Sequence, residues 1–242
     1  MDERIAQIVT RQLGIAEFAE HGQHKLNMAR VLVVGAGGLG APVITYLAAA
    51  GVGTIVIADG DEIALSNLNR QFTHTLADVG RNKAASAAEA ARQINGLSTV
   101  IAIERYLTAE DLEGMLGEID CVVDCVDGFD VRTMVGRACL RAGVPLVEAG
   151  VRDLYGWLLC IDAEHACLEC AGLRDIAYDG SPAVLGASVG VIGSLQALAC
   201  IKILAEAPDV GFGRLVTFDG RLMEMETVEL QRDAGCPAHN LL

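Results

Sequence analysis

Aromatic and basic residues are the two groups that this sequence has least of. Aromatic side chains make up 4% of its 242 residues, and 18 lysines and arginines stand against 32 aspartates and glutamates, a formal net charge of −14 at pH 7. Nucleic acids and anionic membrane surfaces would repel such a chain. We therefore expect neither nucleic-acid binding nor membrane binding.

The chain also lacks the signals of export. No basic stretch precedes an apolar one at the N-terminus, and no apolar run is expected to be long enough to cross a bilayer. Eight cysteines without a secretion signal indicate thiols or metal ligands rather than disulfides. These features predict a cytoplasmic protein.

What the chain does have is a glycine turn between an apolar run and a helical pattern. Residues 31–34 are uniformly apolar, which is typical of a parallel strand covered on both faces. The turn that follows contains Gly35, Gly37, Gly38 and Gly40. Glycines lack a Cβ atom and let backbone N–H groups approach a phosphate at the start of a helix. Asp59 lies 19 residues beyond Gly40, after the next apolar run, where a carboxylate can bind a ribose. The sequence therefore predicts a nucleotide site, with NAD, FAD and ATP as equal candidates.

Alternating strand and helix patterns predict an α/β fold with a Rossmann-like, mostly parallel sheet flanked by helices. The expected strands are residues 31–35, 54–58, 98–104, 119–124 and 145–148, and the expected helices are 39–50, 80–94, 108–116 and 129–142. Beyond residue 150 we expect antiparallel strands at 155–161 and 214–229 around a long apolar helix at 188–205. We interpret residues 1–242 as a single domain. Its parts are an N-terminal helical arm (1–29), a nucleotide-binding half (30–150) and a C-terminal half (151–242).

Cationic residues near the ribose carboxylate distinguish ATP from a redox cofactor. The run Ser66-Asn67-Leu68-Asn69-Arg70-Gln71 follows Asp59, and Lys83 lies at the start of the predicted helix 80–94. A dehydrogenase needs no cations at this place. Cleavage between the α- and β-phosphates does need them, because charge spreads over the phosphate oxygens. Either cation alone would be interpreted as a solvated surface residue, but together they favour ATP.

Asp127 follows the predicted strand 119–124, and ligands of open α/β sheets bind outside the carboxyl ends of such strands. Its carboxylate is suited to hold Mg²⁺ against a triphosphate. The alternative is that Asp127 caps the next helix, a role for which Asp130 is the better candidate. We expect His74 to be a packing residue.

Together these motifs resemble the ThiF/MoeB/HesA family of ATP-dependent adenylyltransferases, relatives of the ubiquitin-activating enzymes, and among them the MoeB-like activators of sulfur carriers. The resemblance runs from about Arg11 to the C-terminus. It rests on Arg11-Gln12, the glycine turn, Asp59 with Asp61, residues 66–71, residues 79–83, residues 124–127 and residues 190–197.

The resemblance implies an ATP site and a homodimer. The residues expected to bind ATP are Gly35, Gly37, Gly38, Gly40, Asp59, Asp61, Asn67, Arg70, Gln71 and Lys83. Those expected to act in catalysis are Arg70, Lys83, Asp127 and Arg11. Asp127 would act through a bound Mg²⁺. Arg11 matches an arginine that family members place on the partner's ATP. This chain departs from the family at Ile8, where a second arginine is usual, and at Gly128, where an asparagine is usual.

Two short-spaced pairs, Cys167 with Cys170 and Cys236 with His239, predict a structural zinc site that attaches the C-terminus to the domain. The family has cysteine in place of His239, and His165 is a reserve ligand. The other five cysteines, Cys121, Cys125, Cys139, Cys160 and Cys200, are expected to be buried. Because residues 175–188 contain no cysteine, we expect no covalent thioester or persulfide step on this chain.

The resemblance implies adenylation of the C-terminal glycine carboxylate of a small ubiquitin-like carrier, similar to ThiS or MoaD and ending in Gly-Gly. The carrier would bind the half 151–242, with its tail beneath residues 175–188, and a separate donor would supply sulfur. The alternatives are an NAD(P)-dependent oxidoreductase, for which no acid/base residue is evident, and a non-catalytic scaffold that binds the carrier.

Overall fold

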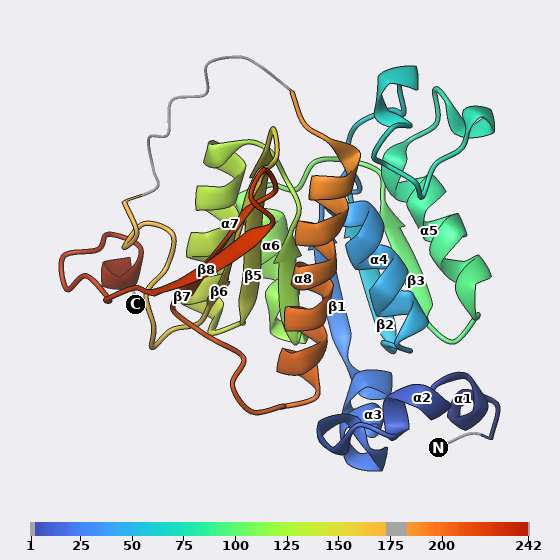
Figure 1. Ribbon diagram of the computed structural model, residues 1–242, viewed down its shortest axis with the longest axis horizontal. Helices are drawn as coiled ribbons and strands as arrows, with labels where there is room; N and C mark the ends of the chain where they lie inside the picture. Colours follow the sequence, from blue (N-terminus) through green and yellow to red (C-terminus); the bar gives the residue numbers. More distant parts are fainter. Residues whose placement is uncertain (1–2, 173–182, 242) are drawn as a thin grey trace.

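The computed structural model describes residues 3–172 and 183–241, and one sheet of eight strands runs through them in the order β3-β2-β1-β4-β5-β6-β7-β8 (Figure 1). The strands are β1 (Arg30–Val34), β2 (Thr54–Ala58), β3 (Thr99–Ile103), β4 (Cys121–Asp124), β5 (Leu146–Arg152), β6 (Tyr155–Ile161), β7 (Arg214–Asp219) and β8 (Glu224–Glu229). Strands β1 to β5 pair in parallel, and β6 to β8 add to β5 in antiparallel order. The predicted Rossmann-like sheet with an antiparallel extension is confirmed.

The strand order places a ligand crevice at one point of the sheet. From β1 the chain runs outward to β2 and β3, and then returns to the other side of β1 as β4. Ligands of open α/β sheets bind where the strand order reverses in this way, at the carboxyl ends of the strands. In this chain that point is the carboxyl end of β1 and β4, where the glycine turn and Asp127 follow directly.

Helices cover both faces of the sheet. They are α4 (Gly40–Ala49), α5 (Lys83–Ile94), α6 (Ala109–Met115), α7 (Phe129–Ala142) and α8 (Gly186–Leu204). Residues of α4, α5 and α8 form one core cluster with Val31 and Val33 of β1, whereas residues of α6 and α7 form a second cluster, on the opposite face, with Leu32 and Val34. Successive side chains of a strand point to opposite faces, so a strand covered on both sides is apolar throughout. This explains the uninterrupted apolar run 31–34.

Helix α8 corrects one expectation. It has 19 residues and is long and apolar enough to cross a membrane, although no such run was expected. Half of its apolar window is buried inside the protein, where the helix packs against α4 and against β4, β5 and β6. The buried half of this apolar surface therefore belongs to the core of the fold.

The N-terminal arm is helical, as predicted, and lies far from the glycine turn. It contains α1 (Glu3–Ile8), α2 (Thr10–Leu13) and α3 (Glu20–Met28). The Gln12 side chain of α2 donates hydrogen bonds to Gln23 Oε1 at 2.6 Å and to the Ala50 carbonyl at 3.3 Å. Because Ala50 ends α4 and the glycine turn begins it, the arm and the turn lie at opposite ends of this helix (Figure 1).

The start of α5 and the capping of α7 differ from the predictions. Helix α5 begins at Lys83 rather than at residue 80, because Asn82 Oδ1 caps it by accepting the Ala85 N–H at 3.1 Å. Helix α7 has Gly128 as its N-cap residue, without a side-chain hydrogen bond, so Asp130 does not have the predicted capping role. Short 3-10 helices complete the described elements: η1 (Ala16–Phe18), η2 (Leu65–Asn67), η3 (Leu76–Asp78), η4 (Leu116–Glu118) and η6 (His239–Leu241).

Close packing of α4 and α8 yields a stability prediction. A Cβ atom on Gly193 of α8 would lie 2.4 Å from Pro42 Cγ and 2.7 Å from the Leu39 carbonyl oxygen. Gly193→Ala should therefore force the helices apart and lower the free energy of unfolding by about 1–3 kcal/mol, measured by urea denaturation.

The matched control is Gly190→Ala in the same helix, where a Cβ atom meets nothing within 4 Å. Alanine favours a helix over glycine, so this variant should gain up to about 1 kcal/mol. Equal stability of the two variants would contradict the predicted close contact.

Candidate nucleotide-binding and metal sites

The glycine turn closes on itself and on the loop that follows β4. Gly35 has a φ of +97°, and a Cβ atom there would lie 2.8 Å from the Cys125 carbonyl oxygen. A Cβ atom on Gly40 would lie 2.3 Å from the Gly35 carbonyl oxygen. Both positions therefore need glycine, Gly35 for its left-handed backbone and Gly40 for the close approach. The contact with Cys125 also brings the turn beside the loop that carries Asp127.

Asp59 lies directly against the glycine turn. It follows β2, is 7% exposed, and accepts the Ala36 N–H at Oδ2 (2.7 Å) and the Asp61 N–H at Oδ1 (2.8 Å). A carboxylate oxygen has more than one lone pair, so each oxygen keeps acceptor capacity. The predicted ribose carboxylate is thus fixed in orientation beside the predicted phosphate turn.

Arg70 crosses over the glycine turn from the segment after η2. Its Cγ and Cδ atoms lie 3.5 and 3.6 Å from where a Cβ atom of Gly38 would be. Its Nη1 donates to the Ser66 carbonyl and to Asn69 Oδ1, both at 2.9 Å. The guanidinium is held by these two local acceptors, while the side-chain stem covers the turn.

Gln71 and Asn67 have different surroundings. Gln71 is 4% exposed, with Nε2 3.5 Å from where a Cβ atom of Gly37 would be, and its Oε1 is buried without a hydrogen-bond partner. Such an orphaned atom is costly and marks a place where a ligand or water belongs. Asn67 instead closes its own turn, because its Oδ1 accepts the Ala64 N–H at 2.9 Å.

Lys83 and Asp61 form an ion pair at the start of α5. The Lys83 ammonium lies 2.7 Å from Asp61 Oδ2, and the Tyr106 hydroxyl donates to Asp61 Oδ1. These two donors, Lys83 first, lower the pKa of Asp61, so that its carboxylate stays ionised. The ammonium is therefore held in place by Asp61, which follows the predicted ribose carboxylate Asp59 by two residues, and the Lys83 side chain is only 10% exposed.

A buried ion pair fixes the loop that presents Asp127. Asp124 is fully buried and Arg132 is 3% exposed, and Arg132 Nη1 lies 3.7 Å from Asp124 Oδ2. Both hold Val126: its N–H donates to Asp124 Oδ1 at 2.9 Å, and its carbonyl accepts from Arg132 Nη2. Asp127, the next residue, is exposed at the carboxyl end of β4. It makes no hydrogen bond or ion pair within the described residues.

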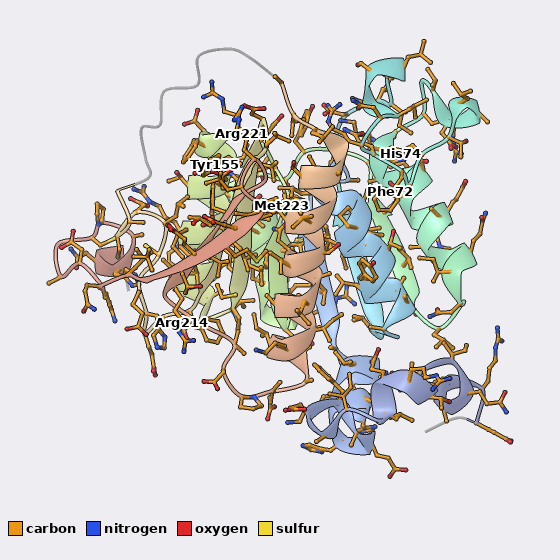
Figure 2. The ribbon with its side chains drawn as sticks, in the orientation of Figure 1. Phe72, His74, Tyr155, Arg214, Arg221 and Met223 are labelled. Carbon is orange, nitrogen blue, oxygen red and sulfur yellow. The ribbon has the colours of Figure 1, made fainter. Side chains whose placement is uncertain are left out.

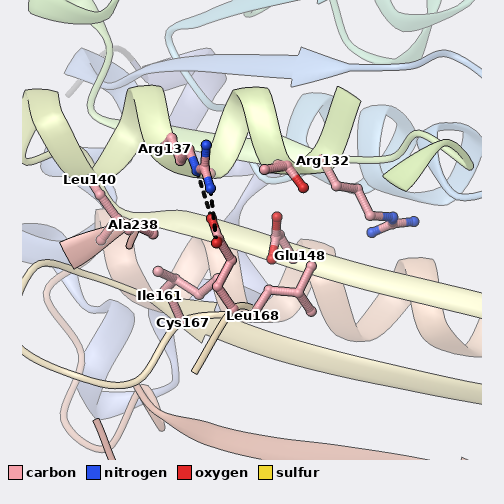
Figure 3. Close-up of a pocket in the computed structure, with 11 residues that line it drawn as sticks. Arg132, Arg137, Leu140, Glu148, Ile161, Cys167, Leu168 and Ala238 are labelled. Atoms are coloured by element: carbon pink, nitrogen blue, oxygen red, sulfur yellow. Dashed lines mark hydrogen bonds and ion pairs between the residues drawn. The ribbon is translucent and has the colours of Figure 1, made fainter. Parts of the chain in front are cut away.

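Glu148 adds a third ionisable group beside this pair. It is 1% exposed, lies beside Asp124 in the register of β4 and β5, and points into the space between β5 and α7 (Figure 3). A cavity of about 20 Å³ lies there, lined by Glu148 and Arg132 among others. Burial, followed by repulsion from Asp124, raises the pKa of Glu148 to about 8. Glu148 is therefore mostly protonated at neutral pH.

His74 contacts the glycine turn through its imidazole ring. It is buried, with Nδ1 3.0 Å from Ser86 Oγ and Nε2 3.2 Å from the Ala36 carbonyl oxygen. Burial lowers its pKa, which favours the neutral ring. The predicted packing role is consistent with this place, and the contact with Ala36 ties the ring to the turn.

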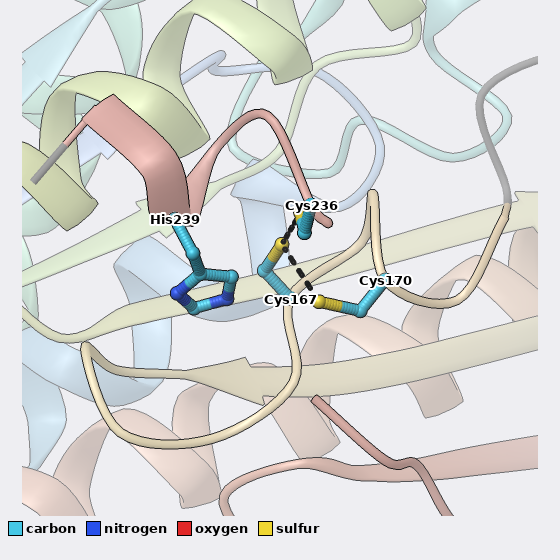
Figure 4. Close-up of side chains that lie close together, drawn as sticks. All are labelled: Cys167, Cys170, Cys236 and His239. Atoms are coloured by element: carbon cyan, nitrogen blue, oxygen red, sulfur yellow. Dashed lines mark hydrogen bonds between the residues drawn. The ribbon is translucent and has the colours of Figure 1, made fainter. Parts of the chain in front are cut away.

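The predicted metal ligands come together at the C-terminus. One ligand atom from each of Cys167, Cys170, Cys236 and His239 lies within 4.8 Å of the others (Figure 4). Cys167 Sγ is 3.7 Å from both Cys170 Sγ and Cys236 Sγ. His239 is 5% exposed, and both of its ring nitrogens are buried without a partner. The donor set and the orphaned nitrogens fit a bound metal ion.

The remaining thiols and the reserve ligand lie elsewhere. His165 is not in the cluster, since its Nδ1 binds Asp162 Oδ1 at 2.8 Å. The five other cysteines are buried, as predicted: Cys121, Cys125, Cys139, Cys160 and Cys200. Burial raises the pKa of the Cys125 thiol, which lies nearest to the glycine turn. Of the segment 175–188, residues 175–182 lie outside the described residues.

The structure thus gathers most of the predicted site, but not all of it. The glycine turn, Asp59, Arg70 and Gln71 meet directly, and Lys83 joins them through Asp61. Arg11 lies in the exposed arm at the other end of α4. The sequence interpretation missed Tyr106, whose signal was an aromatic residue two positions after the predicted strand 98–104. It also missed Glu148, a charged residue inside an apolar strand.

Glu148 yields a pH prediction. The folded protein holds this proton up to about pH 8, whereas the ordinary pKa is 4.5, so folding takes up a proton between these values. Stability is therefore greatest below pH 4.5 as far as this group is concerned, and is lost as pH rises toward 8, by up to about 1.4 kcal/mol per pH unit.

Glu148→Gln should remove this slope and leave the protein as stable as the wild type, or more stable, at the upper end of the range. The measurement is chemical denaturation of both proteins across this range. Parallel stability curves would show that Glu148 is ionised in the folded protein.

Comparison with known proteins agrees with this geometry. The ThiF family model matches residues 9–238. The sulfur carrier protein ThiS adenylyltransferase of Escherichia coli K12 is 36% identical over 244 residues, which cover 98% of this chain and 96% of the relative. The molybdopterin-synthase adenylyltransferase of the same organism is 35% identical, with 93% of each chain covered.

Solved structures share the fold. The crystal structure of E. coli MccB with ATP has a TM-score of 0.84 at 24% identity, and covers 98% of this chain and 74% of MccB. At this identity the likeness concerns the fold alone. Together with the family model and the relatives of similar length, it confirms what the motifs predict: the chain belongs to the ThiF family.

Proposed function

We propose that this protein uses ATP to adenylate the C-terminal glycine carboxylate of a small ubiquitin-like sulfur carrier, similar to ThiS or MoaD. The observation that carries the proposal is that Arg70 lies over the glycine turn, that Asp59 binds this turn, and that Asp59 in turn accepts from Asp61, the partner of Lys83. A ribose carboxylate, a phosphate turn and two cations in one place suit chemistry at the α-phosphate. Named adenylyltransferases that match nearly the whole chain support this assignment.

The reaction needs no nucleophile from the protein. A carboxylate oxygen of the carrier attacks the α-phosphorus, the bond from this phosphorus to the bridging oxygen of the β-phosphate breaks, and pyrophosphate leaves. The product is an acyl-adenylate, a mixed anhydride ready for attack by sulfur from a separate donor. Cys125, the thiol nearest to the glycine turn, is 7% exposed with a raised pKa, and is therefore unsuited to form a covalent intermediate.

Catalysis then consists of positioning and charge neutralisation. Arg70 and Lys83 would stabilise the phosphate oxygens as the bond breaks. The arm of one protomer lies about 15 Å, the length of ten-residue α4, from its own glycine turn. In a homodimer, Arg11 of the partner subunit would therefore supply a third cation to the site.

Asp127 would hold a magnesium ion, which would supply charge neutralisation for the leaving pyrophosphate. The residue is exposed at the ligand end of β4, and the Asp124–Arg132 pair fixes the backbone of the residue before it. One carboxylate oxygen together with phosphates and water is an ordinary coordination set for this ion. Asparagine is usual in the family at the next position, and Gly128 lacks its side-chain amide group.

The carrier would bind the half 151–242, at the edge of the sheet where the glycine turn lies. Strand β5 ends at this edge, and β6 begins there with Tyr155. Tyr155 pairs with Asp219, the last residue of β7, so β7 ends at the same edge. The turn from β7 to β8, which contains Arg221 and Met223, therefore lies there too (Figure 2). Met223 is 78% exposed. An exposed apolar group at this edge supports docking of a folded carrier whose tail reaches the α-phosphate. A reaction with such a partner would take place in the cytoplasm.

The direct test of function is exchange of labelled pyrophosphate into ATP. We expect exchange that depends on a carrier ending in Gly-Gly and disappears when the last glycine is removed. Arg70→Ala should lower the exchange rate about a hundredfold, because a charge stabiliser of the transition state is lost.

Arg141→Ala is the matched control, since Arg141 pairs with Glu113 on the exposed side of α7 and should leave the rate unchanged. Binding of NADH without exchange would indicate an oxidoreductase. Carrier binding without exchange would indicate a scaffold. Either result would overturn the proposal.

We further propose that the ion held by Cys167, Cys170, Cys236 and His239 is a structural zinc. Tetrahedral zinc with sulfur ligands at about 2.3 Å places the sulfurs about 3.8 Å apart, close to the observed 3.7 Å. Burial lowers the pKa of His239, which keeps its ring neutral and able to coordinate. Four protein ligands leave no open position, so this ion would stabilise the fold rather than catalyse.

The zinc proposal predicts about one zinc ion per chain by elemental analysis, in agreement with one closed site. His239→Ala should lower both the zinc content and the midpoint of thermal unfolding, whereas His239→Cys should restore both, because a thiolate is an equivalent ligand. A chelator should destabilise the wild type and have no further effect on His239→Ala. Wild-type protein free of zinc and insensitive to the chelator would contradict this role.

A further inference from the structure

Tyr106 lies at the predicted nucleotide site without a role in the proposed reaction. It follows β3 by a few residues and is 68% exposed. Its ring lies against Gly60, since a Cβ atom there would come within 2.8 to 2.9 Å of three ring carbons. Gly60 is the residue between Asp59 and Asp61. The ring therefore adjoins the ribose carboxylate with one face covered and the other open.

The Tyr106 hydroxyl completes a chain of polar contacts that ends at Lys83. It donates to Asp61 Oδ1, and Asp61 Oδ2 binds the Lys83 ammonium at 2.7 Å. The bond to Asp61, followed by partial burial and the nearby acidic groups, raises the pKa of Tyr106 to about 12. The phenol therefore keeps its proton and remains a donor. Asp61 is held at both oxygens, which fixes the direction in which it holds Lys83.

The place of the ring matches the place of a nucleotide base. Phosphates on the glycine turn and a ribose on Asp59 define one direction along the nucleotide, from the end of β1 toward the end of β2. The base continues in that direction, toward β3, which is the neighbour of β2. Tyr106 follows β3 and leans back over Gly60. An exposed aromatic ring at this position offers a flat apolar surface to a purine.

We propose that Tyr106 is a specificity-determining residue for the adenine nucleotide: its open face stacks on the base, and its hydroxyl positions Asp61 and thereby Lys83. This inference rests on the proposed function, because it takes ATP as the ligand. It assigns two roles to one side chain, and the comparison of two substitutions distinguishes them. Tyr106→Ala removes both roles, and Tyr106→Phe removes the hydroxyl alone.

The first measurement is binding of ATP with Mg²⁺ by calorimetry, without any carrier protein. Tyr106→Ala should weaken binding about tenfold, because stacking on an aromatic ring is lost, whereas Tyr106→Phe should bind ATP like the wild type. The matched control is Tyr46→Ala, which removes a 52% exposed tyrosine from α4 and should change nothing. Gly60→Ala should weaken binding as Tyr106→Ala does, since its methyl group displaces the ring.

The second measurement is base preference in the exchange reaction. A purine stacks better than a pyrimidine, so the ratio of kcat/KM for ATP to that for CTP should fall several-fold in Tyr106→Ala and stay unchanged in Tyr106→Phe. Tyr106→Phe should instead lower kcat with little change in KM, because Lys83 is less well positioned. A purely structural role of Tyr106 would not change the base preference.

The outcomes separate this inference from the proposed function. Wild-type protein that binds ATP, with Tyr106→Ala binding equally well at the same base preference, overturns the role of Tyr106 and leaves adenylation intact. Equal losses of affinity in Tyr106→Ala and Tyr106→Phe overturn stacking. A wild-type chain that binds no ATP overturns both proposals. Wild-type protein that binds ATP through Tyr106 but adenylates no carrier supports the inference alone.

Discussion

The close contact between the glycine turn and the loop after β4 is the constraint on which the site depends. Gly35 can approach the Cys125 carbonyl only because it has no side chain, and this contact holds the carboxyl ends of β1 and β4 together. On one side of the contact lies the turn that is predicted to bind a phosphate, and on the other the loop that carries Asp127. A larger residue at Gly35 would push the Cys125 carbonyl away and so separate the two halves of the site.

Polar groups buried behind this contact give the site its rigidity. The Asp124–Arg132 pair holds both backbone groups of Val126, and His74 holds the Ala36 carbonyl from the other side. A buried ion pair contributes little to net stability, because desolvation offsets its attraction. Its value here is that it fixes a backbone position. The exposed functional groups therefore rest on a backbone that is tied on both sides.

Much of the fold followed from patterns that are local in the sequence. The apolar run 31–34 and the glycines after it define a strand, a turn and a helix within a few residues, and Asp59 has its place because β2 is parallel to β1. Lys83 was placed correctly at a helix start, although the cap at Asn82 shortens the predicted helix. Such features depend on neighbouring residues, which the sequence displays directly.

What the sequence could not give are contacts between distant segments that carry no motif. Tyr106 meets Asp61 across 45 positions of the chain, and Glu148 meets Asp124 only through strand pairing. Neither residue type indicates its partner. The pKa of Glu148 depends on burial, which an isolated charged residue in a strand pattern does not predict. The cluster of Cys167, Cys170, Cys236 and His239 could be predicted because short spacing marks each half of the set.

The last strand has a consequence for how copies of this protein behave toward one another. β8 is the outer strand of the sheet, all of its residues are exposed, and it carries Glu224, Glu226 and Glu229. An unpaired edge strand is a template on which another chain can add, and charged side chains oppose such addition. Two copies meeting edge to edge would bring their glutamates together. The glutamates of β8 thus oppose the addition of a further strand at this edge of the sheet.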